Sequence, residues 1–93
     1  MPRIQRKFPG RSAEEIYARV DEVMGQIASE LSLDYRTDGA RRTGEVGRMG
    51  ISGSYAVREE EVTVELKYPL IVPGALRRKV EERIGEKLDG LFA

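Results

Sequence analysis

Residues Val62–Val80, "VTVELKYPLIVPGALRRKV", show most clearly how this chain folds, because the spacing of the apolar residues changes part-way through. As far as Tyr68 every second residue is apolar, which is typical of a strand with one buried face. After Pro73 the apolar residues recur at helical spacing, at Leu76, Val80, Ile84, Leu88 and Leu91. The stretch therefore predicts a strand, a connection bounded by two prolines, and a helix.

The segment after Ser12 predicts a second helix. Ser12 and Glu15 have the spacing of a capping box, in which each side chain bonds the other residue's amide. The residues that follow place one apolar stripe along this helix, formed by Ile16, Val20, Val23, Met24, Ile27 and Leu31. We therefore expect a helix that starts near residue 13 and packs one face onto the rest of the protein.

Alternating apolar and polar residues predict further strands over residues 3–8, 33–37 and 51–57. Between the last two, glycines recur at every third position, at Gly44, Gly47, Gly50 and Gly53. This period fits neither a strand nor a helix, so it favours a weak, bulged or bent strand.

Together these elements predict one α+β domain over residues 1–93, in the order β-α-β-β-β-α with room for a further short strand. The short turns indicate an antiparallel meander. Each helix has a single apolar stripe and the sheet has a single apolar face. The simplest burial is a two-layer arrangement with both helices on the same side of the sheet.

Charge gives little reason to expect a nucleic-acid partner, because the chain has 16 basic and 16 acidic residues. Basic residues do prevail locally, in the N-terminal segment and over residues 36–48, at Arg3, Arg6, Lys7, Arg11, Arg36, Arg41, Arg42 and Arg48. A nucleic-acid-binding module that uses these arginines is therefore kept as the alternative hypothesis, and we regard nucleic acid as the less favoured partner.

Two residue types that often carry catalysis or hold metals are missing. The chain has no histidine and no cysteine, which removes the commonest general base, metal ligand and thiol nucleophile. Ser52 and Ser54 lie on the polar side of a strand without an evident base, and three consecutive carboxylates at residues 59–61 alternate in direction. We therefore expect no enzyme, no metal and no cofactor. Without an apolar segment long enough to span a membrane, we expect a cytoplasmic protein.

The motifs along the chain resemble the polyhydroxyalkanoic acid system family, whose small proteins run strand, helix, meander, helix. The resemblance rests on Ile4 and Arg6 in the first strand and on the motifs "SAEEIYARV", "LSLDYR", "RMGISGSYAV", "VTVELKYPLIVPG" and "VEERIGEKLDGLF". The chain departs from the family pattern at Phe8-Pro9 and Tyr68-Pro69. The resemblance implies a role in the intracellular storage polyester system, in association with the granule surface or a granule protein. It brings no catalytic residues.

The connection between the two prolines is the candidate contact surface. Tyr68, Leu70, Ile71 and Val72 could present an apolar edge to polyester or another protein, with Arg77, Arg78 and Lys79 as a basic flank. Alternatively, the three aliphatic residues plug the end of the core where the strand turns into the helix. The small side chains of Ser52, Ser54 and Ala56 could also pack against a second copy of the chain.

Overall fold

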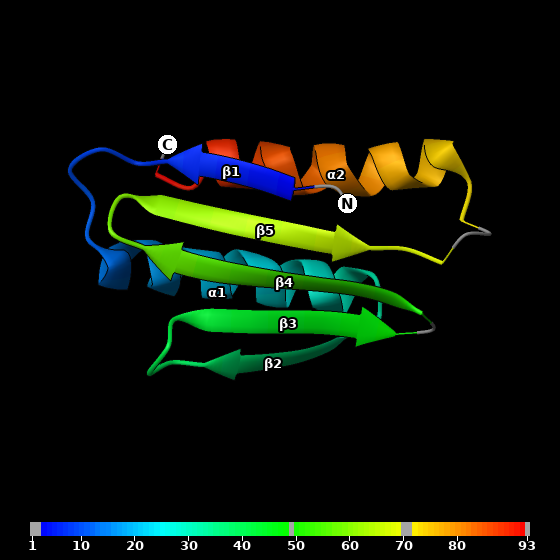
Figure 1. The fold of residues 1–93 in the computed structure, drawn as a ribbon, viewed down its shortest axis with the longest axis horizontal. Coiled ribbons are helices and arrows are strands. Elements are labelled where there is room, and N and C mark those ends of the chain that lie inside the picture. Colours follow the sequence, from blue (N-terminus) through cyan, green and yellow to red (C-terminus); the bar gives the residue numbers. More distant parts are fainter. Residues whose placement is uncertain (1–2, 49, 70–71, 93) are drawn as a thin grey trace.

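The computed structural model describes residues 3–48, 50–69 and 72–92, which form a sheet and two helices (Figure 1). The elements in chain order are β1 (Arg3–Lys7), α1 (Ala13–Glu30), β2 (Asp34–Asp38), β3 (Thr43–Arg48), β4 (Ile51–Arg58), β5 (Glu61–Lys67) and α2 (Gly74–Asp89). This order confirms the predicted α+β class and β-α-β-β-β-α order. The further short strand is β3.

The five strands form one antiparallel sheet in the order β1-β5-β4-β3-β2. Strands β2 to β5 follow one another as a meander, whereas β1 pairs with β5 from the other end of the chain, with Arg3 opposite Glu65. The first and last strands are therefore neighbours, and β1 and β2 are the two edges of the sheet (Figure 1).

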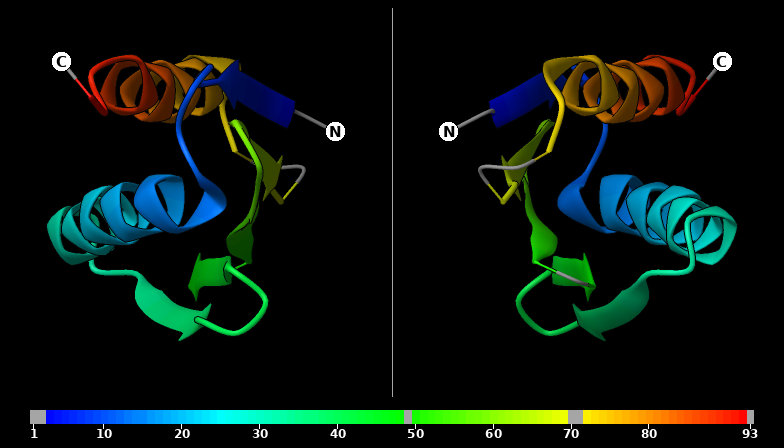
Figure 2. Two further views of the ribbon diagram at one scale, coloured as in Figure 1. Left: turned by 90° about the vertical axis from the view of Figure 1, so that its left-hand side faces the viewer. Right: turned by 90° about the vertical axis from the view of Figure 1, so that its right-hand side faces the viewer.

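Both helices lie on the same side of the curved sheet, as predicted (Figure 2). Their apolar stripes meet the inner sheet face in one core, whose buried members include Ile16, Val20, Met24 and Ile27 from α1, Tyr55, Val57, Val62, Val64 and Leu66 from the sheet, and Ile84 and Leu88 from α2. The helix α1 begins at the predicted capping box: the Ser12 Oγ accepts from the Glu15 amide at 3.2 Å. In α2, Pro73 is the residue before the first helical one.

The glycine-rich segment is not one strand but comprises β3, a turn at Gly50 and the start of β4, so the expectation of a single weak, bulged or bent strand was wrong. Strand β3 pairs with β4 in an unbroken register from Thr43 opposite Ala56 to Arg48 opposite Ile51. Two of the glycines let other groups approach: the Tyr55 ring lies on Gly44 of β3, and Gly50 in the turn, with φ of 87°, packs beside Pro69. The spacing of three residues between glycines therefore reflects separate local requirements, namely close packing at Gly44 and a turn at Gly50.

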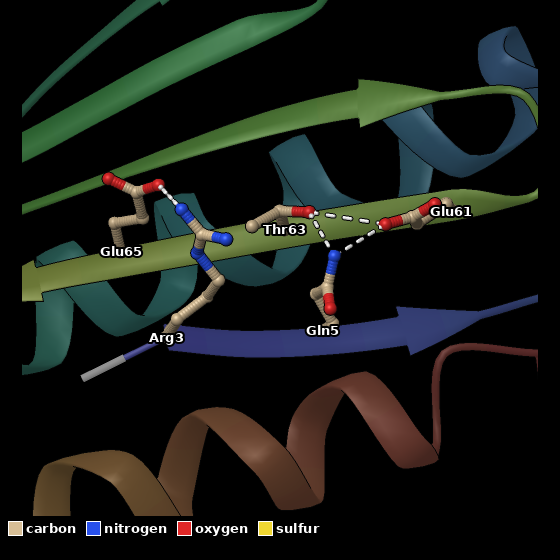
Figure 3. A network of polar contacts seen from close by, with 5 residues as sticks. All are labelled: Arg3, Gln5, Glu61, Thr63 and Glu65. Carbon is tan, nitrogen blue, oxygen red and sulfur yellow. Dashed lines mark hydrogen bonds and ion pairs between the residues drawn. The ribbon is translucent and has the colours of Figure 1, made fainter. Parts of the chain in front are cut away.

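The outer face of the sheet is polar. Figure 3 shows β1 and β5 side by side, with Arg3 Nη2 2.9 Å from Glu65 Oε1 and Gln5 Nε2 2.7 Å from Glu61 Oε1. On β4 the side chains of Ser52 and Ser54 are exposed on this face. Hydrophobic contact is therefore concentrated on the inner face and at the ends of the molecule.

Candidate functional site

One end of the molecule collects partly exposed apolar side chains. The C-terminal ends of α1 and β3 and the start of α2 all lie toward this end of the long axis (Figure 1). We call its side chains the apolar pole, defined as Leu31, Leu33, Ile51, Leu76 and Val80. Among the residues that the structure describes, Leu31 at 51% and Leu76 at 45% are the exposed large hydrophobic side chains.

A narrow cavity runs from the apolar pole into the core. Its volume is about 30 Å³, and its walls come from α1, α2 and the inner sheet face, including Leu31, Leu33, Val64, Leu66 and Val80. Ligand-binding pockets for small molecules usually measure about 300–1,000 Å³. The cavity is much smaller than such pockets, so the feature that the pole offers to a partner is its surface.

Leu31 is exposed because of the way in which helix α1 ends. The chain leaves the helix through a Schellman motif, in which the Leu33 amide donates to the Ala28 carbonyl at 2.8 Å and the Ser32 amide donates to the Ser29 carbonyl at 3.3 Å. Ser32 takes the left-handed conformation that this motif requires, with φ of 56°. This reversal points Leu33 back toward the core and leaves Leu31 at the rim.

An ion pair connects the two helices beside the pole. Arg83 of α2 reaches Glu30 of α1, with Nη2 and Oε2 3.1 Å apart. Both side chains are about half exposed, so the pair contributes little to stability. It does join the helices beside the pole, close to Val80 and Leu31.

The predicted loop residues divide between core and surface. Tyr68 is half-buried against the core, and the Arg77 guanidinium lies 5.6 Å from the centre of its ring. Val72 is half-buried, and Arg78 and Lys79 are exposed. Leu70 and Ile71 lie outside the described residues. The aromatic part of the predicted surface therefore packs inward.

The Tyr68 side chain is half-buried, but its hydroxyl oxygen is buried. Within the described residues no partner lies at hydrogen-bond distance from the Tyr68 oxygen or from the Arg77 Nε. Burial, with a smaller contribution from the Glu81 charge and an opposing one from Arg77, raises the pKa of Tyr68 to about 12. Tyr68 is therefore a neutral side chain at ordinary pH.

Sequence reasoning missed the exposure of Leu31 and Leu76. Both belong to the apolar stripes and were expected to be buried. They lie at the ends of those stripes, Leu31 at the C-terminal cap of α1 and Leu76 in the first turn of α2. Position at the end of an amphipathic stripe was the available signal, because the last residue of a stripe can extend beyond the layer it packs on.

A cluster of hydrogen-bonded polar groups lies in the interior, between α1 and the sheet. The Tyr35 hydroxyl is 2.7 Å from Asp21 Oδ1 and 2.6 Å from the Tyr55 hydroxyl. Because a carboxylate only accepts, Tyr35 donates to Asp21 and Tyr55 donates to Tyr35. This chain of hydrogen bonds connects α1 with β2 and β4.

The tyrosine chain is suited to structure rather than to acid–base chemistry. Burial is the main cause that raises the pKa of Tyr55 to about 12, and burial with the hydrogen bonds to Tyr55 and Asp21 raises the pKa of Tyr35 well above its usual value. A general base has to release its proton near neutral pH. Neither hydroxyl meets that requirement.

The other candidate residues are spread over the surface. The carboxylates of Glu59, Glu60 and Glu61 bind three different groups, namely the Ala13 amide, the Gly10 amide and the Gln5 amide nitrogen. Ser52 lies opposite Lys67 in the register, but no hydrogen bond joins their side chains within the described part of the chain.

Five of the seven arginines proposed for nucleic acid have acidic partners, and Arg36 forms no ion pair within the described residues. Arg3 pairs with Glu65, Arg6 with Asp89 and Arg11 with Glu15. In the second group Arg41 pairs with Asp38 and Arg42 with Glu14, while Arg48 donates to the Ser32 carbonyl. These pairs offer no support for a continuous basic surface, so nucleic-acid binding stays a prediction.

Comparison with known proteins gives the family. The model of the family described as "Putative polyhydroxyalkanoic acid system protein" matches residues 4–92. The chain belongs to this family. The match covers both the apolar pole and the tyrosine chain, and it confirms the resemblance seen in the motifs. No curated protein matches the chain.

The family assignment places the protein in the polyhydroxyalkanoic acid system. Within the described residues, neither helix is both long and apolar enough to cross a membrane. The described residues offer several surfaces for contact, among them the apolar pole, the polar outer face of the sheet and the sheet edges.

Proposed function

We propose that the protein is a non-catalytic component of the polyhydroxyalkanoate storage system that binds the surface of the polyester granule through its apolar pole. Family membership supports the system, and one observation supports the surface. Leu31 and Leu76 are the exposed large hydrophobic side chains of the described residues. Leu31 caps the C-terminal end of α1 and Leu76 belongs to the first turn of α2, and these two helix ends lie toward the same end of the molecule (Figure 1).

Contact with a polyester surface would bury the Leu31 and Leu76 side chains, and this burial favours binding. Burying a leucine side chain is worth about 1.5–3 kcal/mol. Leu31 and Val80 line the same apolar cavity, and Leu76 lies one helical turn from Val80 on α2. A polyester surface offers alkyl groups and few hydrogen-bond donors, and therefore matches such a patch better than a polar partner does.

The proposal of a non-catalytic role rests on the inventory of reactive groups. The chain has neither histidine nor cysteine. The pKa values of Tyr35, Tyr55 and Tyr68 are raised, which keeps these hydroxyls protonated near neutral pH. Incubation with polyester granules should therefore release no hydroxy acid. Release that depends on the folded protein would contradict this part of the proposal.

The test of granule binding is co-sedimentation of the purified protein with polyester granules. We expect the double variant Leu31→Gln/Leu76→Gln to bind more weakly by a factor of about 10 or more, because each tenfold change corresponds to about 1.4 kcal/mol. The matched control is Ala18→Gln, which adds the same polar group to the exposed face of α1. It should bind like the wild type.

Thermal unfolding of all three proteins separates lost contact from lost fold. Wild-type protein that stays in the supernatant, or equal binding by the wild type and the double variant, would overturn the granule proposal. Binding to the apolar pole should also change little with salt. The same proteins are tested on duplex and single-stranded DNA at ~50 mM salt, where retention with a steep salt dependence would favour the nucleic-acid alternative instead.

A further inference from the structure

The two edges of the sheet differ in how they are protected. At β1, the bond from the Phe8 amide to the Glu60 carbonyl fixes the pairing alternation, so Gln5 directs its main-chain groups away from β5. The Arg6 guanidinium covers this edge: Nη1 donates to the Gln5 carbonyl at 2.9 Å, and Nε lies 2.6 Å from Asp89 of α2. An added strand would have to displace Arg6.

Strand β2 has no such cover. It is the outermost element on its side of the molecule (Figures 1 and 2). The bond from the Val57 amide to the Arg42 carbonyl fixes the alternation on this side. Within β2, residues 34, 36 and 38 therefore bond to β3, and Tyr35 and Thr37 direct their main-chain groups outward.

The outward groups have no partner in the described part of the chain. Besides the amides and carbonyls of Tyr35 and Thr37, the Leu33 carbonyl also faces outward, while the Leu33 amide is already bonded to Ala28. An unpaired edge of this kind is a template for another strand. We propose that the occupant is a second copy of the chain, paired antiparallel through β2 around Tyr35, so that the two sheets continue into one another.

Charge selects both the occupant and the register. With Tyr35 opposite Tyr35 of the second copy, Asp34 lies opposite Arg36, and the same pair forms again across the two-fold axis. Asp34 and Arg36 are exposed, and neither forms an ion pair within the described residues. The edge is therefore complementary to itself.

Neighbouring registers fit less well. Pairing around Arg36 would place Arg36 against its own copy and Asp34 against Asp38. Pairing around Thr37 would place Arg36 opposite Asp38, whose Oδ1 already accepts from the Ala40 amide at 3.1 Å and the Arg41 amide at 3.2 Å. The register around Tyr35 uses the two charges that are unoccupied.

The Tyr35 register makes a specific prediction for disulfide capture, because the wild-type chain contains no cysteine. Asp34 and Arg36 of the second copy would form a non-hydrogen-bonded pair, with Cα atoms about 4.5 Å apart, which suits a disulfide. We expect an equimolar mixture of Asp34→Cys and Arg36→Cys to form covalent dimers on mild oxidation. Either variant alone should not, because like positions lie about 8 Å apart in this register.

A control shows whether capture reports pairing or random encounter. Lys7→Cys places an exposed thiol on the other edge strand, and its mixture with Asp34→Cys should remain uncross-linked. Dimers from Arg36→Cys alone, or equal capture in the control mixture, would overturn the proposed pairing.

Sedimentation velocity of the uncross-linked protein provides an independent test, over concentrations from ~1 µM to ~1 mM because the interface is small. We expect a concentration-dependent dimer that Asp34→Arg weakens at least about tenfold, and that Asp34→Arg/Arg36→Asp restores. Unfolding temperatures check that each variant folds. A monomer at every concentration would overturn the inference. So would a dimer whose affinity is the same in both variants, because such a dimer must form through another surface, such as Ser52, Ser54 and Ala56.

The experiments can contradict the dimer proposal without contradicting the granule proposal, and the reverse. Antiparallel pairing through β2 directs the two apolar poles toward opposite ends of the dimer. It brings Leu33 of the pole beside the paired edge, whereas Leu31 and Leu76 lie at the ends of the helices and outside the paired strands. Loss of dimerisation through Asp34→Arg should therefore leave granule co-sedimentation in place.

Discussion

The Tyr55 ring lies so close to the backbone of Gly44 that a Cβ atom at residue 44 would overlap it. The two residues are directly opposite one another in the β3–β4 register. The ring cannot easily turn away, because Tyr55 is buried and its hydroxyl bonds to Tyr35. Residue 44 therefore has to be glycine, because the Tyr55 ring packs directly against its backbone.

We predict that Gly44→Ala lowers the free energy of unfolding by about 2–3 kcal/mol, because the added methyl forces the ring or the strand to move. Urea denaturation measures the effect. Gly39→Ala is the matched control, since the nearest atom to its new methyl is the Tyr17 hydroxyl at 3.9 Å. It should stay within about 0.5 kcal/mol of the wild type. Equal losses in the two variants would contradict the proposed contact.

The buried tyrosines predict a loss of stability at alkaline pH. Burial raises the pKa of Tyr55 to about 12, whereas tyrosine in an unfolded chain ionises near 10. Above pH 10 the unfolded state therefore releases this proton while the folded state retains it, and the free energy of unfolding decreases as pH rises. The stabilisation is fully present below pH 10 and is lost from about pH 10 to about pH 12.

Urea denaturation at several pH values up to 11.5 tests this window. We expect a decrease on the order of 1–3 kcal/mol from Tyr55 alone. Tyr55→Phe should cost about 1 kcal/mol at neutral pH, through its lost hydrogen bond to Tyr35, and should make the alkaline decrease shallower. An identical pH dependence in this variant would show that other groups cause the decrease.

Tyr68→Phe should have the opposite effect at neutral pH. The Tyr68 hydroxyl is buried without a partner among the described residues, so it carries a desolvation cost that no hydrogen bond offsets. Removing it should leave stability unchanged or raise it by about 1 kcal/mol. Thermal and urea unfolding of Tyr68→Phe beside Tyr55→Phe make the comparison. A loss as large as that of Tyr55→Phe would mean that the hydroxyl has a partner.

Ser32→Gly should stabilise the protein by about 0.5–1 kcal/mol. Ser32 has φ of 56° at the end of α1, a conformation that glycine adopts without steric cost. The gain is partly offset by the greater freedom of glycine in the unfolded chain. Ser29→Gly, three residues earlier inside the helix, should instead destabilise by about 0.5 kcal/mol. Changes of the same sign would contradict the Schellman arrangement.

Arg6→Ala should cost more stability than Asp89→Ala, although the two side chains form one ion pair at 2.6 Å. Arg6 also donates to the Gln5 carbonyl and packs against Gly85, whereas Asp89 is largely exposed. We expect about 1–2 kcal/mol for Arg6→Ala and less than about 1 kcal/mol for Asp89→Ala, because exposed ion pairs contribute little. Equal costs in urea denaturation would mean that the ion pair alone is important.

Much of the fold follows from local patterns along the chain. The alternation from Val62 to Tyr68, the capping box at Ser12 and the two apolar stripes predict the order of the elements and the face that each one buries. The same residues carry the resemblance to the polyhydroxyalkanoic acid system family. These features are readable because the direction of a side chain depends on its neighbours in the same helix or strand.

The candidate surfaces depended on tertiary structure. Residue spacing is enough to assign Leu31 and Leu76 to apolar stripes, but the packed molecule is needed to show that these stripe ends are exposed while Tyr68 packs inward. In the same way, the glycine period was visible, but its reason, the ring of Tyr55 on Gly44, was not. The physical reason is common to these cases: exposure and close approach depend on segments distant in sequence, and the spacing of residues along one segment carries no record of them.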